Sequence, residues 1–211
     1  MMKCPRCVQR IHRAAESCPH CGFSIADMDS HHGADHQLLP SLADRAGILK
    51  RDERKLVEDA MRKFADTFPQ LFVVIYTGSF GNLENLRQFS FWLLNRSTFE
   101  DLPPDKQNHG GIVLTIDPNG KFAGFSHGYL LDAFLDESDT FECLSRAHAY
   151  WLEGRYADGI TKAILHLRLL LVQKCRHARR NPKYFLRKVM PKTMTSHTPN
   201  TPPDPQSEVK P

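Results

Sequence analysis

The chain has 211 residues, of which 41% are hydrophobic, so it is long enough for one domain of ordinary size with a small module beside it. No apolar run approaches the eighteen or so residues that span a bilayer, and no apolar stretch near the N-terminus resembles an export signal. These features argue against a membrane-spanning or exported protein, and we expect a soluble protein in the cytoplasm.

The formal net charge of +4 is unevenly distributed along the chain. Residues 159–203 contain ten Lys or Arg and no Asp or Glu, and subtracting this +10 from the total leaves the rest of the chain at −6. The basic character is therefore local, which points to one cationic segment and not to a uniformly basic domain.

The N-terminal residues carry two Cys-Pro-x-Cys pairs with ten residues between them, Cys4 with Cys7 and Cys18 with Cys21. Each pair can direct two thiolates at one ion, and the two pairs complete the tetrahedral four-sulfur shell of a closed structural zinc site. A disulfide or a redox pair of thiols is the alternative, although a cytosol keeps cysteines reduced. We predict a zinc ribbon over residues 1–25 whose folding depends on Zn²⁺. Its role is either structural, as an N-terminal module held together by the metal, or docking to a partner.

Residues 26–40 are interpreted as a linker because they show no periodic pattern. They contain His31, His32 and His36, together with Gly33 and Pro40. A histidine cluster can capture a transition metal, but we favour a polar tether.

The main domain begins with an amphipathic helix. Apolar residues recur at helical spacing from Arg51 to Phe68, and Pro69 ends the pattern. The apolar run 71–77 then predicts a strand that is covered on both faces. A turn at 78–82 leads into a second helix, with Asn82 as its cap. The Gly-x-x-Gly sequence of this turn lacks the further residues of a P-loop or dinucleotide fingerprint, so phosphate binding is the weaker reading.

The next segments predict a hairpin and then three helices. Residues 111–117 and 121–126 read as antiparallel strands joined by a tight turn at 118–120. Helices are expected at 129–135, 141–152 and 156–177. We place the main domain at residues 41–177, followed by a tail at 178–211 that is first basic and then rich in Pro and Thr, and that we expect to be disordered.

The order of several short motifs resembles the TPM domain family, which includes a thylakoid-lumen acid phosphatase, a photosystem II repair factor and many bacterial proteins. The motifs lie at residues 42–49, 72–77, 110–114, 127–136 and 156–160, and the resemblance covers about residues 42–172. It implies an α/β/α sandwich with a small mixed sheet between helices. In some members it also implies phosphatase activity or a site for a divalent cation, Ca²⁺ or Mg²⁺, built from acidic residues.

The resemblance also suggests candidate site residues. Asp44 and Asp136 match acidic positions of the family, although each can instead cap or brace a helix. The family's acidic motif before the central strand is replaced by Gln107–Gly111, so the carboxylates expected there are missing. His109 and His127 flank the hairpin strands and are candidates for an acid, a base or a ligand in one cleft. The alternative is that both are loop histidines without chemistry.

Cys143 and Cys175 fall on predicted helices, and nothing in the sequence marks either thiol as activated. The segment Lys174–Lys192 is densely basic and interleaved with Tyr184 and Phe185, so it can bind nucleic-acid phosphates or anionic lipid headgroups, or simply aid solubility. Its basic residues are Lys174, Arg176, Arg179, Arg180, Lys183, Arg187, Lys188 and Lys192.

The sequence therefore predicts an accessory or interaction protein that is non-catalytic or weakly active and has an unidentified protein partner. One alternative is a metal-dependent hydrolase similar to acid phosphatases. Another is binding of nucleic acid or an anionic membrane through the basic segment.

Overall fold

The computed structural model describes residues 2–12, 14–81, 85–103, 108–183 and 185. The strands are β1 (Met2–Lys3), β2 (Arg10–Ile11), β3 (Gln37–Leu39), β4 (Leu42–Asp44), β5 (Phe72–Thr77), β6 (Ser97–Phe99), β7 (Gly111–Asp117) and β8 (Phe122–His127). The helices are α1 (Ile25–His32), α2 (Arg51–Thr67), α3 (Leu86–Arg96), α4 (Glu137–Leu152) and α5 (Tyr156–Arg180), with short 3₁₀ helices η1 (Asn108–Gly110) and η2 (Tyr129–Leu131). Among the helices in these ranges, none is both long and apolar enough to cross a membrane.

Four strands form one mixed sheet in the order β4-β5-β7-β8. β4, β5 and β7 run parallel, whereas β8 pairs antiparallel with β7 across the predicted turn at 118–120. All seven residues of β7 and five of the six residues of β5 are buried, because both faces of these strands are covered. The predicted central strand and the predicted hairpin are confirmed.

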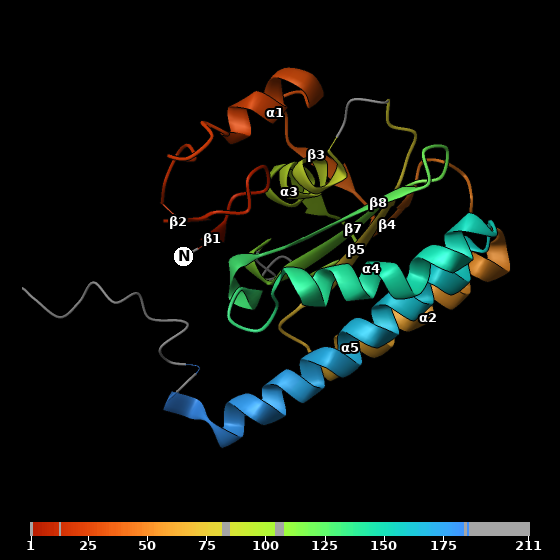
Figure 1. Cartoon of the computed structure of the whole chain (residues 1–211). Coiled ribbons are helices and arrows are strands. Elements are labelled where there is room, and N and C mark those ends of the chain that lie inside the picture. Colours follow the sequence, from red (N-terminus) through yellow and green to blue (C-terminus); the bar gives the residue numbers. More distant parts are fainter. Residues whose placement is uncertain (1, 13, 82–84, 104–107, 184, 186–211) are drawn as a thin grey trace, which may run out of the picture.

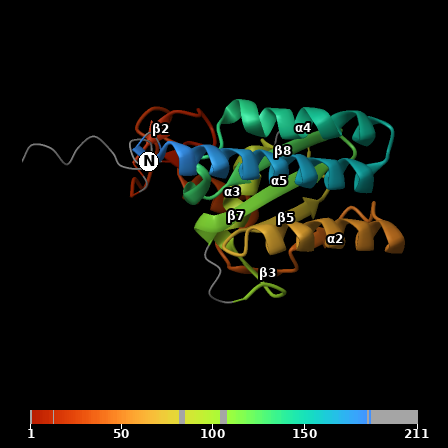
Figure 2. The same ribbon diagram turned by 90° about the horizontal axis from the view of Figure 1, so that it is seen from below.

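Helices cover the two faces of the sheet, as Figures 1 and 2 show. Alternate residues of β5 divide between the layers: Val73 and Ile75 pack with α2, α4 and α5, whereas Phe72 and Val74 pack with α3. The long helix α5 contributes an apolar stripe at helical spacing, formed by Ile160, Ile164, Leu167 and Leu171. The predicted α/β/α sandwich with a small mixed sheet is confirmed.

The cap predicted for the second helix, Asn82, lies outside the described residues. In the described part, α3 begins after Asn85, whose side chain accepts hydrogen bonds from the backbone N–H groups of Arg87 and Gln88. A phosphate bound at the start of this helix would need these same N–H donors. The structure therefore gives no support to phosphate binding at the 78–82 turn.

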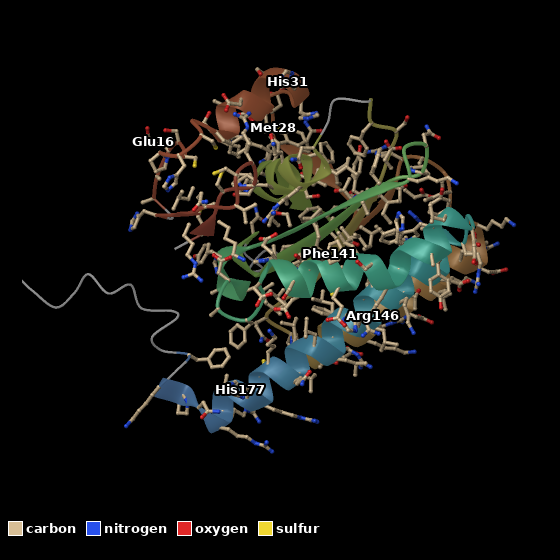
Figure 3. The ribbon with its side chains drawn as sticks, viewed as in Figure 1. Glu16, Met28, His31, Phe141, Arg146 and His177 are labelled. Atoms are coloured by element: carbon tan, nitrogen blue, oxygen red, sulfur yellow. The ribbon has the colours of Figure 1, made fainter. Side chains whose placement is uncertain are left out.

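The segment expected to be a tether without regular structure contains α1 and the short strand β3, so that expectation is wrong. β3 pairs in parallel with β6, and Met28 of α1 is buried against α3 (Figure 3). Little in the sequence indicates this structure, because α1 has only eight residues and one buried side chain. Contacts with the rest of the domain stabilise this segment, and its own sequence pattern does not.

Other differences are smaller. The helix expected at 129–135 is limited to η2, α4 starts at Glu137, and α5 continues to Arg180. Arg187, Lys188, Lys192 and the rest of the tail from 186 onward lie outside the described residues.

Candidate metal centre and the adjoining cavity

The four N-terminal cysteines converge. Their Sγ atoms all lie within 4.8 Å of one another, and the separation is 3.6 Å both for Cys4 and Cys21 and for Cys7 and Cys18. A tetrahedral ion with metal–sulfur bonds of about 2.3 Å would set its sulfur atoms roughly 3.8 Å apart. The four thiols therefore fit around one metal ion of the size and coordination of zinc.

The local backbone explains this convergence. β1 and β2 pair antiparallel, and the N–H of Cys4 donates to the carbonyl of Gln9, which fixes the first turn. In the second turn the N–H of Gly22 donates to the carbonyl of Cys18. Gly22 has φ +73, a left-handed conformation that side chains other than glycine rarely adopt, so this residue lets the chain fold back beside Cys21.

The pKa values of the neighbouring Cys4 and Cys18 thiols shift in opposite directions. Burial raises the pKa of the Cys4 thiol to about 12. Burial acts in the same direction on Cys18, but the backbone N–H groups of His20 and Cys21 stabilise its thiolate and bring its pKa to about 6. The two directions differ because a thiolate at one sulfur opposes a second negative charge nearby. Binding of a divalent cation removes this opposition, since metal ligation displaces thiol protons.

The N-terminal module, residues 2–12 and 14–32, shares a core with the sheet. Cys4, Cys18 and Phe23 are buried in the same apolar cluster as Trp92 of α3 and Phe72 of β5. The module is therefore not a separate head beside an independent body.

A charged contact reinforces this packing. Asp29 of α1 accepts from Arg96 Nε at 2.9 Å and from Trp92 Nε1 at 3.1 Å, both on α3. The hydrogen bond from Arg96 is the main cause of the lowered pKa of Asp29.

A cavity of about 510 Å³, here called the module cavity, lies between this module and the sheet. Its wall includes Cys18, His109 and His127, so the two predicted histidines share one cavity. The His109 ring stacks on the Tyr129 ring, with centroids 5.0 Å apart. Within the described residues, the four cysteines are the only group of three or more His, Cys, Asp or Glu side chains close enough to hold a metal ion.

His127 and Asp132 form a partly buried pair in the wall of this cavity, with side chains that are 10% and 19% exposed. His127 Nδ1 lies 3.2 Å from the carbonyl oxygen of Gly128 and 3.8 Å from Asp132 Oδ1. Burial lowers the pKa of His127 and raises the pKa of Asp132 to about 6. Both groups are therefore biased toward their neutral forms.

Glu137 links the sheet's two covering layers at this cavity. Its carboxylate accepts two hydrogen bonds from Arg87 of α3, at 2.7 and 2.9 Å, and Lys3 Nζ lies 3.4 Å away. Burial raises the pKa of Glu137, but Arg87 and Lys3 outweigh it, so the net pKa is lowered. Sequence reasoning missed both Asp132 and Glu137, since neither stood out from the acidic residues around it.

Asp44 lies elsewhere and braces the backbone. Its carboxylate accepts from the N–H groups of Ile48 at 3.1 Å and Leu49 at 2.9 Å, and also from the Thr77 hydroxyl. Asp44 is aligned with Thr77, and Thr77 with Ile116 of β7, whereas His127 is aligned with Ile112. Asp44 and His127 are therefore near opposite ends of the sheet.

Asp136 caps α4. Its carboxylate accepts from the Ser138 hydroxyl at 2.6 Å and from the N–H groups of Ser138 and Asp139 at 3.0 and 3.1 Å. The Ser138 hydroxyl is the main cause of its lowered pKa, about 2. The four candidate residues thus do not form one site. The two histidines line one cavity, whereas the carboxylates of Asp44 and Asp136 accept hydrogen bonds from backbone N–H groups elsewhere.

The other two cysteines, Cys143 and Cys175, lie on α4 and α5. Cys143 is fully buried, and burial raises the pKa of its thiol to about 12. Burial also raises the pKa of Cys175. Neither thiol is activated.

Comparisons with known proteins agree with this fold. No curated protein matches the chain. Similar solved structures include the N-terminal domain of a protein from P. gingivalis (17% identity, 63% of this chain and 82% of that one, TM-score 0.49) and the N-terminal domain of the cg2496 protein from Corynebacterium glutamicum (9%, 61% and 78%, TM-score 0.48). The BA42 protein from Bizionia argentinensis is 11% identical over 60% of this chain and 83% of that one, with a TM-score of 0.50, and this likeness concerns the fold alone. The TPM domain matches residues 42–168, more than half of the sequence, and the chain therefore belongs to the TPM domain family.

Proposed function

We propose that this protein is a non-catalytic accessory protein that binds another protein, and that Zn²⁺ is its structural metal. The observation that carries the proposal is the use of the two family-matched carboxylates. Asp44 and Asp136 each accept three hydrogen bonds from nearby backbone and hydroxyl groups. Carboxylates engaged in this way are poor ligands for a second metal and poor proton-transfer groups.

Zinc is supported by the donor set and by its spacing. Four sulfur ligands in two Cys-Pro-x-Cys turns suit a closed tetrahedral site, which leaves no position for a reacting water. The same four free cysteines suit a reducing compartment, so we place the protein in a cytoplasm, and the family resemblance suggests a bacterial one.

The experiment is an assay of the full-length protein with p-nitrophenyl phosphate in the presence of Mg²⁺, Mn²⁺ or Ca²⁺. We expect no turnover above that of a heat-denatured sample. Turnover that is lost in Asp44→Ala or Asp136→Ala, with circular dichroism showing that the variant is folded, would overturn the proposal. His109→Ala is the companion variant, because it alters the module cavity without removing a helix cap.

One observation favours the hydrolase alternative. His109, His127 and Asp132 all line the module cavity, and His127 is biased toward the neutral form that can accept a proton. Activity that survives Asp44→Ala but is lost in His127→Gln would assign chemistry to this cavity.

A third candidate function is binding of nucleic acid through the end of α5 and the residues just beyond it. Arg176, Arg179, Arg180 and Lys183 are exposed, and within the described residues no carboxylate pairs with any of them. The expected binding to a single-stranded oligonucleotide weakens steeply as salt rises and disappears when residues 174–192 are changed to Gln at their basic positions. Binding to phosphatidylserine vesicles and not to the oligonucleotide would assign the segment to membranes.

A further inference from the structure

β8 is an outer strand of the main sheet, and one side of its backbone has no partner in the described part of the chain. The N–H of Gly128 donates to the carbonyl of Gly111, and the antiparallel register then turns alternate residues of β8 toward β7. The backbone N–H and C=O groups of Ala123, Phe125 and His127 therefore point away from the sheet. No hydrogen bond joins these outward groups to another described residue.

A groove of about 350 Å³, here called the β8 groove, follows this free edge. One wall is the start of α3, from Asn85 to Arg87, and the other is α4, which contributes Phe141 and Leu144. Figure 1 shows β8 lying between these two helices. Gly124 keeps the edge close to α3, because a Cβ at this position would lie 2.5 Å from the Leu86 backbone.

Two aromatic side chains stand exposed beside the groove. Phe122 of β8 and Phe141 of α4 are 69% and 71% exposed, and both line the groove. Figure 3 shows Phe141 on α4 beside β8. Exposed phenylalanines beside the unpaired backbone groups of an edge strand are typical of a surface that is buried when a partner binds.

Charged side chains lie at both ends of the groove. At one end the guanidinium of Arg87 is paired with the carboxylate of Glu137, so this end carries no excess charge. At the other end Lys121 Nζ lies 3.4 Å from the Leu152 carbonyl and, among the described residues, has no carboxylate partner. An occupant that is apolar at its centre and carries a carboxylate at the Lys121 end matches this distribution.

We propose that the β8 groove binds an extended peptide segment of a partner protein, which adds to β8 as a fifth strand. Its backbone pairs with Ala123 and Phe125, an apolar side chain packs between Phe122 and Phe141, and a carboxylate faces Lys121. A second copy of this chain is the competing occupant, and the oligomeric state tested below distinguishes it from a peptide. This inference rests on the proposed role in protein binding and identifies the surface that performs it.

The test uses full-length zinc-loaded protein and a fluorescein-labelled peptide, acetyl-Glu-Val-Thr-Phe-Thr-Val-Glu-amide. We expect saturable binding, with slowed hydrogen exchange at the amides of Ala123 and Phe125, which are outward-facing in the free protein. Phe141→Ala should weaken binding about tenfold, because it removes an exposed apolar contact and not a core residue. Leu169→Ala is the matched control, since Leu169 is also exposed, at 56%, but lies on α5.

Peptide variants separate strand addition from simple apolar adhesion. Because alternate amides of an extended peptide face the same side, N-methylation of one alternate set should abolish binding, and methylation of the other set should preserve it. Equal effects of the two sets, or no saturable binding up to about 1 mM, would overturn the proposal. Concentration-dependent dimerisation that is lost in Phe141→Ala would also overturn it, by assigning the edge to a second copy.

This result is independent of the phosphatase assay. Turnover in that assay together with peptide binding would defeat the non-catalytic function and leave the β8 groove supported. If neither phosphatase turnover nor peptide binding is observed, the β8 groove proposal fails and the non-catalytic function stands.

Discussion

Burial acts in opposite directions on two neighbouring groups in the wall of the module cavity. It lowers the pKa of His127 and raises that of Asp132, although their atoms lie 3.8 Å apart and an ion pair would have the reverse effect. Desolvation therefore outweighs the attraction between them. Asp132 Oδ2 is buried without a hydrogen-bond partner among the described residues, which adds to the cost of its negative charge.

Asp132→Asn should stabilise the protein at neutral pH. A folded pKa raised from 3.8 to about 6 gives a stability contribution that is complete below pH 3.8 and is lost as the pH rises through 6. Asn removes this loss, so we expect a gain of about 2 kcal/mol in the free energy of unfolding at pH 7.5 and almost none at pH 4. Urea titrations at the two pH values measure it.

The charged groups that act on Asp132 include Lys3, Arg10 and Glu137, and all remain in the variant. Asp66→Asn, which changes an exposed carboxylate on α2, is the control and should give no such pH-dependent difference. An equal gain at pH 4 and pH 7.5 would contradict the assignment to ionisation.

At the scale of elements, the free N–H groups at helix starts and turns explain why the candidate residues Asp44 and Asp136 bind backbone and not a ligand. Asp44 and Asp136 both follow an extended segment and precede a helix or turn, where a short carboxylate accepts free backbone N–H groups. The sequence already allowed Asp44 and Asp136 to be helix caps. It could not distinguish a cap from a metal ligand, because an aspartate at the start of a helix can serve as either, whereas the structure shows the hydrogen bonds that the two carboxylates accept.

Asp136→Ala should destabilise the protein by about 1–2 kcal/mol through loss of this cap. The lowered pKa of Asp136, about 2, means that its contribution is present above pH 3.8 and is lost as the pH falls toward 2. Thermal unfolding at pH 7 and pH 2.5 should therefore show a large difference from the native chain at pH 7 and a smaller one at pH 2.5. Asp136→Ser keeps an acceptor and should retain most of the stability.

The sequence predicts long elements well and short ones poorly. The helix from Arg51, the strand from Phe72 and the hairpin each repeat their pattern over enough residues to identify them. The strands β1, β2, β3, β4 and β6 have two or three residues, which is too few for a period. Cysteine spacing predicts the metal cluster because four ligands constrain one another, whereas no motif marks Asp132, Glu137 or the free edge of β8.

At the scale of the whole molecule, the metal module is part of one face of the sandwich. Its buried residues Cys4, Cys18 and Phe23 continue the apolar cluster built by α3 and the sheet. Binding of the proposed metal by the four cysteines would therefore stabilise the whole domain and not only the first 25 residues.

Removal of the metal should lower the unfolding temperature of the whole protein. We expect one zinc per chain by atomic emission, and a parallel loss of zinc and of the near-ultraviolet signal from Trp92 in Cys18→Ser. Cys175→Ser is the cysteine control and should retain full zinc content, since Cys175 lies on α5. Unchanged thermal unfolding in metal-free protein would show that the module folds without help from an ion.

The packing of Met28, Phe23 and Asp29 onto α3 limits how far this protein can be truncated from its N-terminus. The TPM match begins at residue 42, yet the surface of α3 that these three residues cover includes Trp92, which is only 4% exposed. A chain trimmed to the family boundary would leave that indole in water and Arg96 without its carboxylate. We therefore expect the smallest autonomously folding unit of this protein to extend upstream of the family boundary and to include the cysteine turns.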